Sequence, residues 1–240
     1  EGLTHELFGD VIFDLGTARL EAAGAVLPVD FLVYPTEFRA DWYEPAGGDF
    51  NRLLEEMGAD EDRNSIAAEL AVGAAKSGSV FVMVRRHDHG LRIEQMTTSM
   101  GVKSGIMFGD PSYARVYDST RAGLEAGTTR IAVGTSQSIG QGIDVPRVHD
   151  VVLAAPAASN KQLVGQARGR ACRPWGGAKE GRVHYLWDLH VAGFYQHLKN
   201  LDRWFPGRVW VVEKGKRVAA GEWSRKHRER VRKEEGWFAR

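Results

Sequence analysis

The sequence predicts an α/β fold in which a parallel sheet carries helices on both faces. Short apolar stretches typical of buried strands alternate with helical patterns, and Gly78 and Gly127 end two of the predicted helices. Parallel neighbouring strands need crossover connections, so this alternation favours a parallel sheet with functional groups at the carboxyl ends of its strands. The predicted strands are residues 79–84, 103–108 and 130–134, and the predicted helices are residues 62–76, 89–99 and 112–126.

Residues 1–60 are expected to form a lead-in to this sheet. A short helix at 17–23 and a strand at 31–34 precede residues 38–60, whose aromatic and glycine residues indicate an exposed connecting loop with a short helix at 50–56. An aromatic wedge that separates nucleic-acid strands is the alternative interpretation of this loop.

The helix predicted at 62–76 has an apolar residue at every fourth position, which is the spacing of one helix face. Asp62 or Asn64 can cap its first turn, because their side-chain oxygens accept hydrogen bonds from free backbone N–H groups. The expected buried positions are Ile66, Leu70 and Ala74 in this helix, and Val116 and Leu124 in the helix at 112–126.

A further strand is predicted at 183–188 and a further helix at 194–204. We therefore expect one domain over residues 61–206, followed by an extension over 207–240. The expected core positions of the last helix are Phe194, Leu198 and Leu201.

Residues 207–240 are expected to form a basic helical tail. Residues 214–240 contain ten Lys or Arg against four Glu, together with three aromatic residues. Cations can follow a phosphate backbone and aromatic rings can stack on bases, so nucleic-acid contact through Arg225 and Lys226 is one interpretation. Glu and Arg three or four positions apart also pair with each other, so a solvated surface helix is the other.

Composition predicts a globular protein in a reducing compartment. Hydrophobic residues make up 43% of the 240 residues, enough to bury a core, and no apolar run of eighteen or more residues occurs. Cys172 is the single cysteine and is expected to be a packing residue, and a cytoplasmic location is expected. The formal net charge of +1 gives no global nucleic-acid signal, so any such signal must be local.

The stretch 135–173 carries two polar signatures on either side of an apolar strand predicted at 151–155. The second signature has the pattern Q-x-x-G-R-x-x-R, and on a helix its defined positions share one face. Two guanidiniums one turn apart can hold an oxyanion such as a triphosphate, and a glycine beside them leaves room for close approach. An arginine pair that only bridges surface carboxylates is the alternative. The defined residues are Gln166, Gly169, Arg170 and Arg173.

These signatures resemble motifs V and VI of superfamily 2 helicases, in the branch of DNA-repair and phage-recombination translocases. Residues 135–144 are similar to motif V, a Thr followed by Gly-x-Asp, residues 166–173 to motif VI, and the strand at 79–84 to motif IV. The resemblance implies the second, C-terminal RecA-like domain of such a helicase. For a phage-encoded chain, the expected location is the host cytoplasm.

The resemblance also implies roles for individual residues. In this family the motif VI arginines reach the γ-phosphate of ATP, which implies catalytic roles for Arg170 and Arg173, with Gln166 ordering the nucleotide or the attacking water. The implied ATP contacts are Gly142, Asp144 and Gly169, and the implied nucleic-acid contacts are Thr135, Ser136, Arg85 and Arg86. A helix cap at Thr135-Ser136, a turn at Asp144 and a solvated loop at Arg85-Arg86 remain the alternatives.

The sequence contains neither a G-x-x-x-x-G-K-[ST] loop nor an Asp-Glu pair after an apolar strand. We therefore expect a first RecA-like domain, in the same or a separate chain, to hold most of the ATP and Mg²⁺, and the chain alone to be inactive in ATP hydrolysis. The expected partners are this domain and nucleic acid, taken to be DNA, with no membrane. His87 and His89 lack a second ligand cluster, so no metal site is expected.

A nucleic-acid-binding or regulatory module that keeps the fold without turnover is the alternative function. An unrelated doubly wound enzyme with a small phosphorylated ligand is a third possibility.

Overall fold

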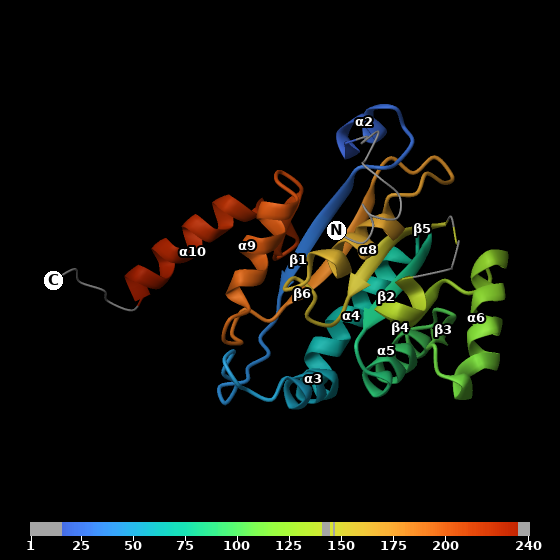
Figure 1. Cartoon of the computed structure of the whole chain (residues 1–240), viewed down its shortest axis with the longest axis horizontal. Helices are drawn as coiled ribbons and strands as arrows, with labels where there is room; N and C mark the ends of the chain where they lie inside the picture. Colours follow the sequence, from blue (N-terminus) through green and yellow to red (C-terminus); the bar gives the residue numbers. More distant parts are fainter. Residues whose placement is uncertain (1–15, 141–144, 146, 235–240) are drawn as a thin grey trace, which may run out of the picture.

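The computed structural model describes residues 16–140, 145 and 147–234, and an eight-stranded sheet forms the centre of this part of the chain (Figure 1). The strand order is β3-β4-β2-β5-β6-β1-β7-β8, and each neighbouring pair is parallel except β7 with β8. The strands are β1 (Val29–Pro35), β2 (Ser79–Val84), β3 (Ser104–Met107), β4 (Ile131–Thr135), β5 (Val148–Leu153), β6 (Gly181–Trp187), β7 (Val209–Glu213) and β8 (Lys216–Ala219).

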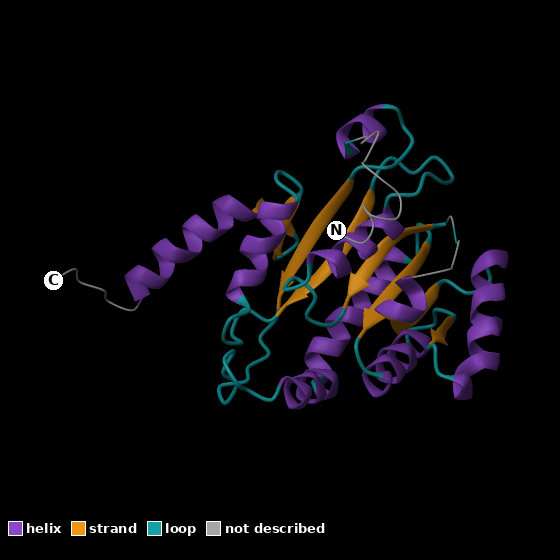
Figure 2. Ribbon diagram, in the orientation of Figure 1, coloured by secondary structure: helices purple, strands orange, loops and turns teal. Residues whose placement is uncertain are grey.

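Helices cover both faces of this sheet (Figure 2). No helix in the described ranges is long and apolar enough to cross a membrane. The helices are α2 (Thr17–Ala22), α3 (Phe50–Ala59), α4 (Glu61–Ala74), α5 (His87–Ser99), α6 (Ala114–Ala126), α7 (Ser136–Gly140), α8 (Lys161–Ala171), α9 (Tyr195–Trp204) and α10 (Ala220–Glu234), with a short 3-10 turn, η1 (Pro111–Tyr113), before α6.

The central strands are apolar on both sides because each side faces a separate core. In β2, Val80, Val82 and Val84 point into the core beneath α4 and α5, whereas Phe81 and Met83 point into the core beneath α8 and α9. All six residues of β2 are buried. The predicted α/β fold, a mostly parallel sheet with helices on both faces, is confirmed.

Helix α4 meets the sheet through a face that only partly matches the predicted one, since Ala74 is buried as predicted. Its buried residues are Arg63, Asn64 and a row of alanines, while Ile66 and Leu70 are only partly buried. Small alanines let the helix axis approach the sheet closely, and the two polar side chains are buried because they find partners there. The helix is capped by the Asp60 carboxylate, which accepts from the Arg63 backbone N–H at 2.7 Å, and not by Asp62 or Asn64.

Two of the other predicted core positions have opposite outcomes in α6. Leu124 is fully buried, as predicted, but Val116 is 46% exposed, so its predicted place on the apolar side is wrong. In α9 the predicted core positions Phe194, Leu198 and Leu201 are all buried.

Segments from both ends of the chain complete the sheet. Strand β1 lies between β6 and β7, with Phe31 opposite both Val183 and Val209. Strands β7 and β8 were not predicted, and they place part of the segment 207–240 in the same sheet as residues 61–206. The basic helix α10 follows them and extends away from the body of the molecule (Figure 1).

The loop at 38–60 is held by its own apolar cluster. Phe38, Tyr43 and Leu53 are buried together with Phe194. The Trp42 indole N–H donates to Glu56 Oε2 at 2.7 Å, so this ring is also fixed locally. These contacts favour the connecting role of the loop over that of an aromatic wedge.

Candidate functional site

A polar pocket of about 530 Å³ lies where three neighbouring strands end. Strands β2, β3 and β4 are adjacent and parallel, so the residues that follow them meet at one edge of the sheet. The pocket is lined by Val84, Arg85, His87, Gly109, Asp110, Thr135, Ser136, Gln137 and Ser138. It brings together three of the four predicted nucleic-acid contacts of motifs IV and V.

Thr135 is the last residue of β4, and a short hydrogen-bonded turn fixes it at the pocket. Its backbone N–H donates to Ser138 Oγ at 3.0 Å, and its own Oγ1 accepts from the Ser138 N–H at 3.3 Å. The Ser138 hydroxyl donates in turn to the Met107 carbonyl of β3 at 2.5 Å. Thr135 therefore does cap α7, and the same bonds hold its hydroxyl and that of Ser138 at the strand ends. Sequence reasoning missed Ser138.

The two predicted arginines after β2 go to different places. Arg85 lines the pocket, with its guanidinium 5.7 Å from the centre of the Phe50 ring. Arg86 does not line the pocket, and its Nε lies 3.1 Å from Asp88 Oδ1 at the start of α5.

His87 was considered only as a metal ligand, but it forms part of the pocket wall. Its ring stacks on Phe108 at 4.2 Å between ring centres, and Tyr113 meets both rings edge-on. Asp110 lies nearby, and hydrogen bonds from Ser112 lower the pKa of its carboxyl group. No group of three metal-ligating side chains occurs within the described ranges.

The motif VI arginines lie on the side of the sheet where the strands begin, whereas the pocket lies where the strands end. Helix α8 follows the carboxyl end of β5, where the Asn160 side chain caps it by accepting from Gln162 N–H at 2.9 Å. The helix then runs back to the amino ends of β1 and β6, where the Leu27 N–H donates to the Cys172 carbonyl at 2.6 Å. The pocket and the arginines are therefore separated by roughly the length of α8.

Helix α8 ends at Ala171, two residues before the Q-x-x-G-R-x-x-R signature ends at Arg173. Arg170 lies in the last turn of α8 and is 7% exposed, whereas Arg173 lies beyond the helix end at Ala171. The prediction that all four residues share a helical face thus holds for Gln166, Gly169 and Arg170 only. A Cβ built on Gly169 would meet no atom within 4 Å, so packing within the described part of the chain does not require this glycine.

Two predicted ATP contacts, Gly142 and Asp144, lie outside the described residues. Cys172 is partly buried, and its thiol donates to the Gly169 carbonyl at 3.3 Å, in keeping with the packing role expected of it.

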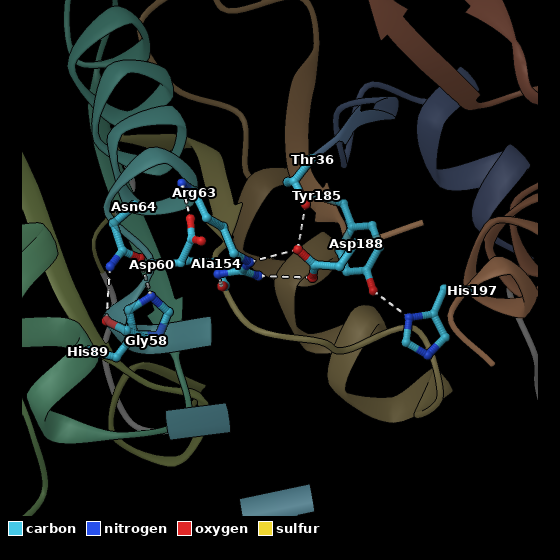
Figure 3. Close-up of polar contacts among 10 residues, drawn as sticks. All are labelled: Thr36, Gly58, Asp60, Arg63, Asn64, His89, Ala154, Tyr185, Asp188 and His197. Carbon is cyan, nitrogen blue, oxygen red and sulfur yellow. Dashed lines mark hydrogen bonds and ion pairs between the residues drawn. The ribbon is translucent and has the colours of Figure 1, made fainter. Parts of the chain in front are cut away.

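A buried ion pair joins α4 to three strand ends (Figure 3). Arg63 Nε donates to Asp188 Oδ1 at 2.8 Å, Nη2 to Oδ2 at 3.2 Å, and Nη1 to the Ala154 carbonyl at 2.6 Å. The Thr36 hydroxyl also donates to Asp188, at 2.6 Å. The pair therefore fixes the residues that follow β1, β5 and β6, including the start of the segment that leads to α8.

Two buried histidines flank this network in Figure 3. His89 Nε2 lies 2.9 Å from Asn64 Oδ1, and burial lowers the pKa of His89 to about 3. His197 Nδ1 lies 2.8 Å from the Tyr185 hydroxyl, and burial lowers the pKa of His197 to about 4. Both rings are neutral at pH 7 and serve as hydrogen-bonding core residues.

Comparison with solved structures finds this architecture in helicases. The chain superposes on the C-terminal domain of the DEAD-box protein Dbp5 with a TM-score of 0.54 and 18% identity, over 85% of this chain and 97% of that domain. This chain has the fold of a helicase C-terminal domain. No family model and no curated protein sequence matches it.

Longer helicase structures match over part of their length. S. cerevisiae Dbp5 bound to RNA and ADP BeF3 gives a TM-score of 0.58 at 14% identity, covering 97% of this chain and 51% of that one. T4 UvsW gives 0.57 at 19% identity, covering 78% of this chain and 40% of that one. The chain thus spans about half the length of these proteins or less. The predicted C-terminal RecA-like helicase fold is confirmed, and the DNA-repair branch stays a prediction.

Proposed function

We propose that this chain is the second motor domain of an ATP-dependent nucleic-acid helicase or translocase. The observation that carries the proposal is the arrangement of its two signatures in a helicase C-terminal fold: Thr135 lies at the strand-end pocket, and Arg170 lies at the far end of α8. One edge of the domain can then hold a nucleic-acid strand while another surface serves a nucleotide.

On the nucleotide side, Arg170 and Arg173 are assigned to the γ-phosphate of an ATP that a first RecA-like domain binds. Burial restricts the Arg170 side chain, so little reorganisation is needed when charge develops on the transferred phosphoryl group. Gln166, one helical turn before Arg170, is assigned to ordering the nucleotide or the attacking water. Gly169, Gly142 and Asp144 are assigned to close contact with the nucleotide.

Mg²⁺ is assigned to the first domain together with most of the ATP contacts. The described residues contain no group of three His, Cys, Asp or Glu side chains that could hold a metal ion. The contribution of this chain is the arginine pair Arg170 and Arg173, which would complete the ATP site of the first domain.

On the nucleic-acid side, the pocket has the chemistry for a backbone phosphate. Thr135 and Ser136 offer hydroxyl groups and Arg85 offers a guanidinium, while the Ser138 hydroxyl holds Thr135 in place. Binding of this kind reads no base edges, which suits a motor that steps along any sequence. The strand is proposed to be DNA, and RNA is the other outcome of a binding test.

ATP hydrolysis with nucleic acid present tests the motor assignment. The chain alone should show no turnover, and adding a first domain that carries the phosphate loop should produce it. Arg173→Ala should then lower turnover by about 10³-fold or more with unchanged nucleic-acid affinity. Lys76→Ala, which removes an exposed cation at the same sheet edge, is the matched control.

Turnover by the chain alone, or full turnover by Arg173→Ala in the reconstituted pair, would contradict the motor assignment. A nucleic-acid-binding or regulatory module without turnover is the second candidate, because the strand-end pocket is formed by this chain itself. If the chain binds nucleic acid but adding a first domain produces no ATP hydrolysis, the result favours that candidate.

A further inference from the structure

Helix α10 is a charged helix whose first turns are fixed to the sheet. The Trp223 ring is 4% exposed and meets the buried Trp187 ring edge-on at 5.2 Å. The Trp223 indole N–H donates to Glu213 Oε1 at 2.7 Å, and His227 stacks on Trp223 at 4.5 Å between ring centres. These contacts bind the first half of the helix to β7 and the core.

The second half of α10 extends away from the sheet (Figure 1). Seven residues follow His227 in the helix, which corresponds to a length of about 10 Å. After Trp223 the helix sequence contains only one large apolar residue, Val231, so it offers no apolar stripe to a further protein core.

This helix carries an excess of positive charge that the rest of the chain lacks. Six Lys or Arg and three Glu lie within Ala220–Glu234, whereas the whole chain has a net charge of +1, so the remainder is slightly acidic. Arg225 is exposed, and Lys226 pairs with Glu222 at 2.6 Å. Arg225, Arg228 and Arg232 are spaced i, i+3 and i+7 in the sequence, which is the spacing of one helix face. A polyanion with regularly spaced charges is the complementary partner.

The helix and the strand-end pocket lie at opposite ends of the sheet. The pocket forms at β3, β4 and β2, whereas α10 packs on β7, β8 and α9. Five or six strand spacings of about 4.8 Å separate β4 from β7 and β8, so the two surfaces are roughly 25 Å or more apart. This distance corresponds to about seven base-pair steps of duplex at 3.4 Å each.

We infer that α10 is a second nucleic-acid contact, which holds the phosphate backbone of a duplex about seven or more base pairs from the strand gripped at the Thr135 pocket. This inference rests on the proposed nucleic-acid role of the pocket, but not on ATP turnover. A chain with two separated contacts binds a long duplex through both and a short one through either, so affinity gains with length from the linkage of the contacts.

The test compares two labelled DNA hairpins, with stems of 6 and 20 base pairs, by fluorescence anisotropy without ATP. The variant replaces Arg225, Arg228 and Arg232 by Ala. On the long stem it should bind about tenfold more weakly near 0.1 M salt, and the slope of log affinity against log salt should fall by about two to three. On the short stem the loss should stay within about twofold.

The matched control removes three exposed cations at the amino-terminal edge of the sheet, Arg19→Ala, Lys76→Ala and Lys179→Ala. It changes the net charge equally and should leave both affinities and both slopes near those of the unaltered chain. Circular dichroism of the α10 variant checks that the helix is retained.

Three results would overturn the inference: an equal loss on both stems, no loss on either, or an equal loss in the control. Binding of the α10 variant to DNA with unchanged slope but loss of an acidic protein partner would assign the helix to that partner instead. Arg85→Ala tests the pocket separately, because it should weaken binding to the short stem. If Arg85→Ala binds the short stem as tightly as the unaltered chain, that result counts against the proposed pocket and not against α10.

Discussion

At the scale of single residues, the ion pair between Arg63 and Asp188 has the largest expected effect on stability. Both side chains are at most 1% exposed. Asp188→Asn leaves the Arg63 charge buried with a neutral partner, so the free energy of unfolding should fall by about 3–5 kcal/mol. Urea unfolding followed by tryptophan fluorescence measures this loss.

The exposed pair Arg121–Glu125 provides the control for this prediction. Its side chains are 49% and 50% exposed, and Arg121→Ala should change the free energy of unfolding by less than about 1 kcal/mol. A double variant Arg63→Met/Asp188→Leu removes both charges and should recover part of the loss of Asp188→Asn. Equal losses for the buried and exposed pairs would contradict the assigned importance of burial.

The buried histidines predict a pH dependence of stability. The pKa values of His89 and His197 are lowered from 6.5 to about 3 and about 4 in the folded chain, so the unfolded chain binds more protons at intermediate pH. The stability that these rings retain above pH 6.5 is therefore lost progressively as the pH falls toward 4. The slope reaches at most about 2.7 kcal/mol per pH unit for two protons.

Urea unfolding at several pH values between 7 and 4 measures this slope. His89→Gln keeps a side-chain N–H for Asn64 Oδ1 but does not titrate. The slope of its free energy of unfolding against pH should therefore be smaller by the contribution of about one proton. A variant curve as steep as that of the unaltered chain would show that His89 is not the titrating group.

At the scale of elements, two glycines of helix α8 allow effects on stability to be distinguished from effects on turnover. Cβ atoms built on Gly165 and Gly169 of α8 would meet nothing within 4 Å, so alanine at either position should stabilise the chain by up to about 1 kcal/mol. In the reconstituted motor Gly169→Ala should lower turnover, because Gly169 is assigned to the surface that the nucleotide approaches, whereas Gly165→Ala should not. Thermal unfolding and ATPase assays of both variants give the two readouts, and equal turnover would remove Gly169 from the site.

Gly134 in β4 shows the opposite case. A Cβ there would collide with the Met107 carbonyl and with Ile139, so Gly134→Ala must shift β4 against β3 and α7. We expect a loss of about 1–3 kcal/mol in the free energy of unfolding and weaker nucleic-acid binding, since Thr135 follows directly. Stability and oligonucleotide affinity measured on the same sample check both effects, and unchanged values of both would contradict the close packing.

The elements that the sequence predicted well are those whose pattern is local. Strands β2, β4 and β5 are short apolar runs buried on both sides, and α9 has regular core spacing. The hairpin of β7 and β8 was missed among the charges of the tail. Its signal was the pair Lys214-Gly215, which has φ values of 49° and 74°, as a two-residue hairpin turn requires.

The site was predicted in part for the same reason. Thr135, Arg170 and Arg173 belong to contiguous signatures, and Arg85 directly follows a predicted strand. Ser138 instead gains its role from the Met107 carbonyl, 31 residues earlier in the chain. Arg63 and Asn64 break the apolar pattern of α4, and only their long-range partners explain why they are buried. Contacts between distant residues cannot be read from local periodicity.

At the scale of the whole molecule, the sheet unites segments that the sequence analysis had divided at residue 206. Val209 and Val211 of β7 are buried against β1, and Trp223 of α10 covers Trp187 of β6. A chain truncated after residue 206 would expose the edge of β1 and this apolar surface to water. It should therefore unfold at a temperature lower by about ten degrees or more, which corresponds to roughly 3–5 kcal/mol or above, and it should tend to aggregate.

A chain truncated after His227 is the matched control, because it keeps β7, β8 and the Trp223 anchor but loses most of the charged half of α10. Its melting temperature should stay near that of the full chain, while its affinity for long duplexes falls as in the arginine variant. Differential scanning fluorimetry with light scattering measures both truncations. A stable, soluble chain ending at residue 206 would mean that the tail is an appendage. If the chain ending at residue 206 is unstable and the chain ending at His227 is stable, then β7, β8 and the first half of α10 are part of the domain itself.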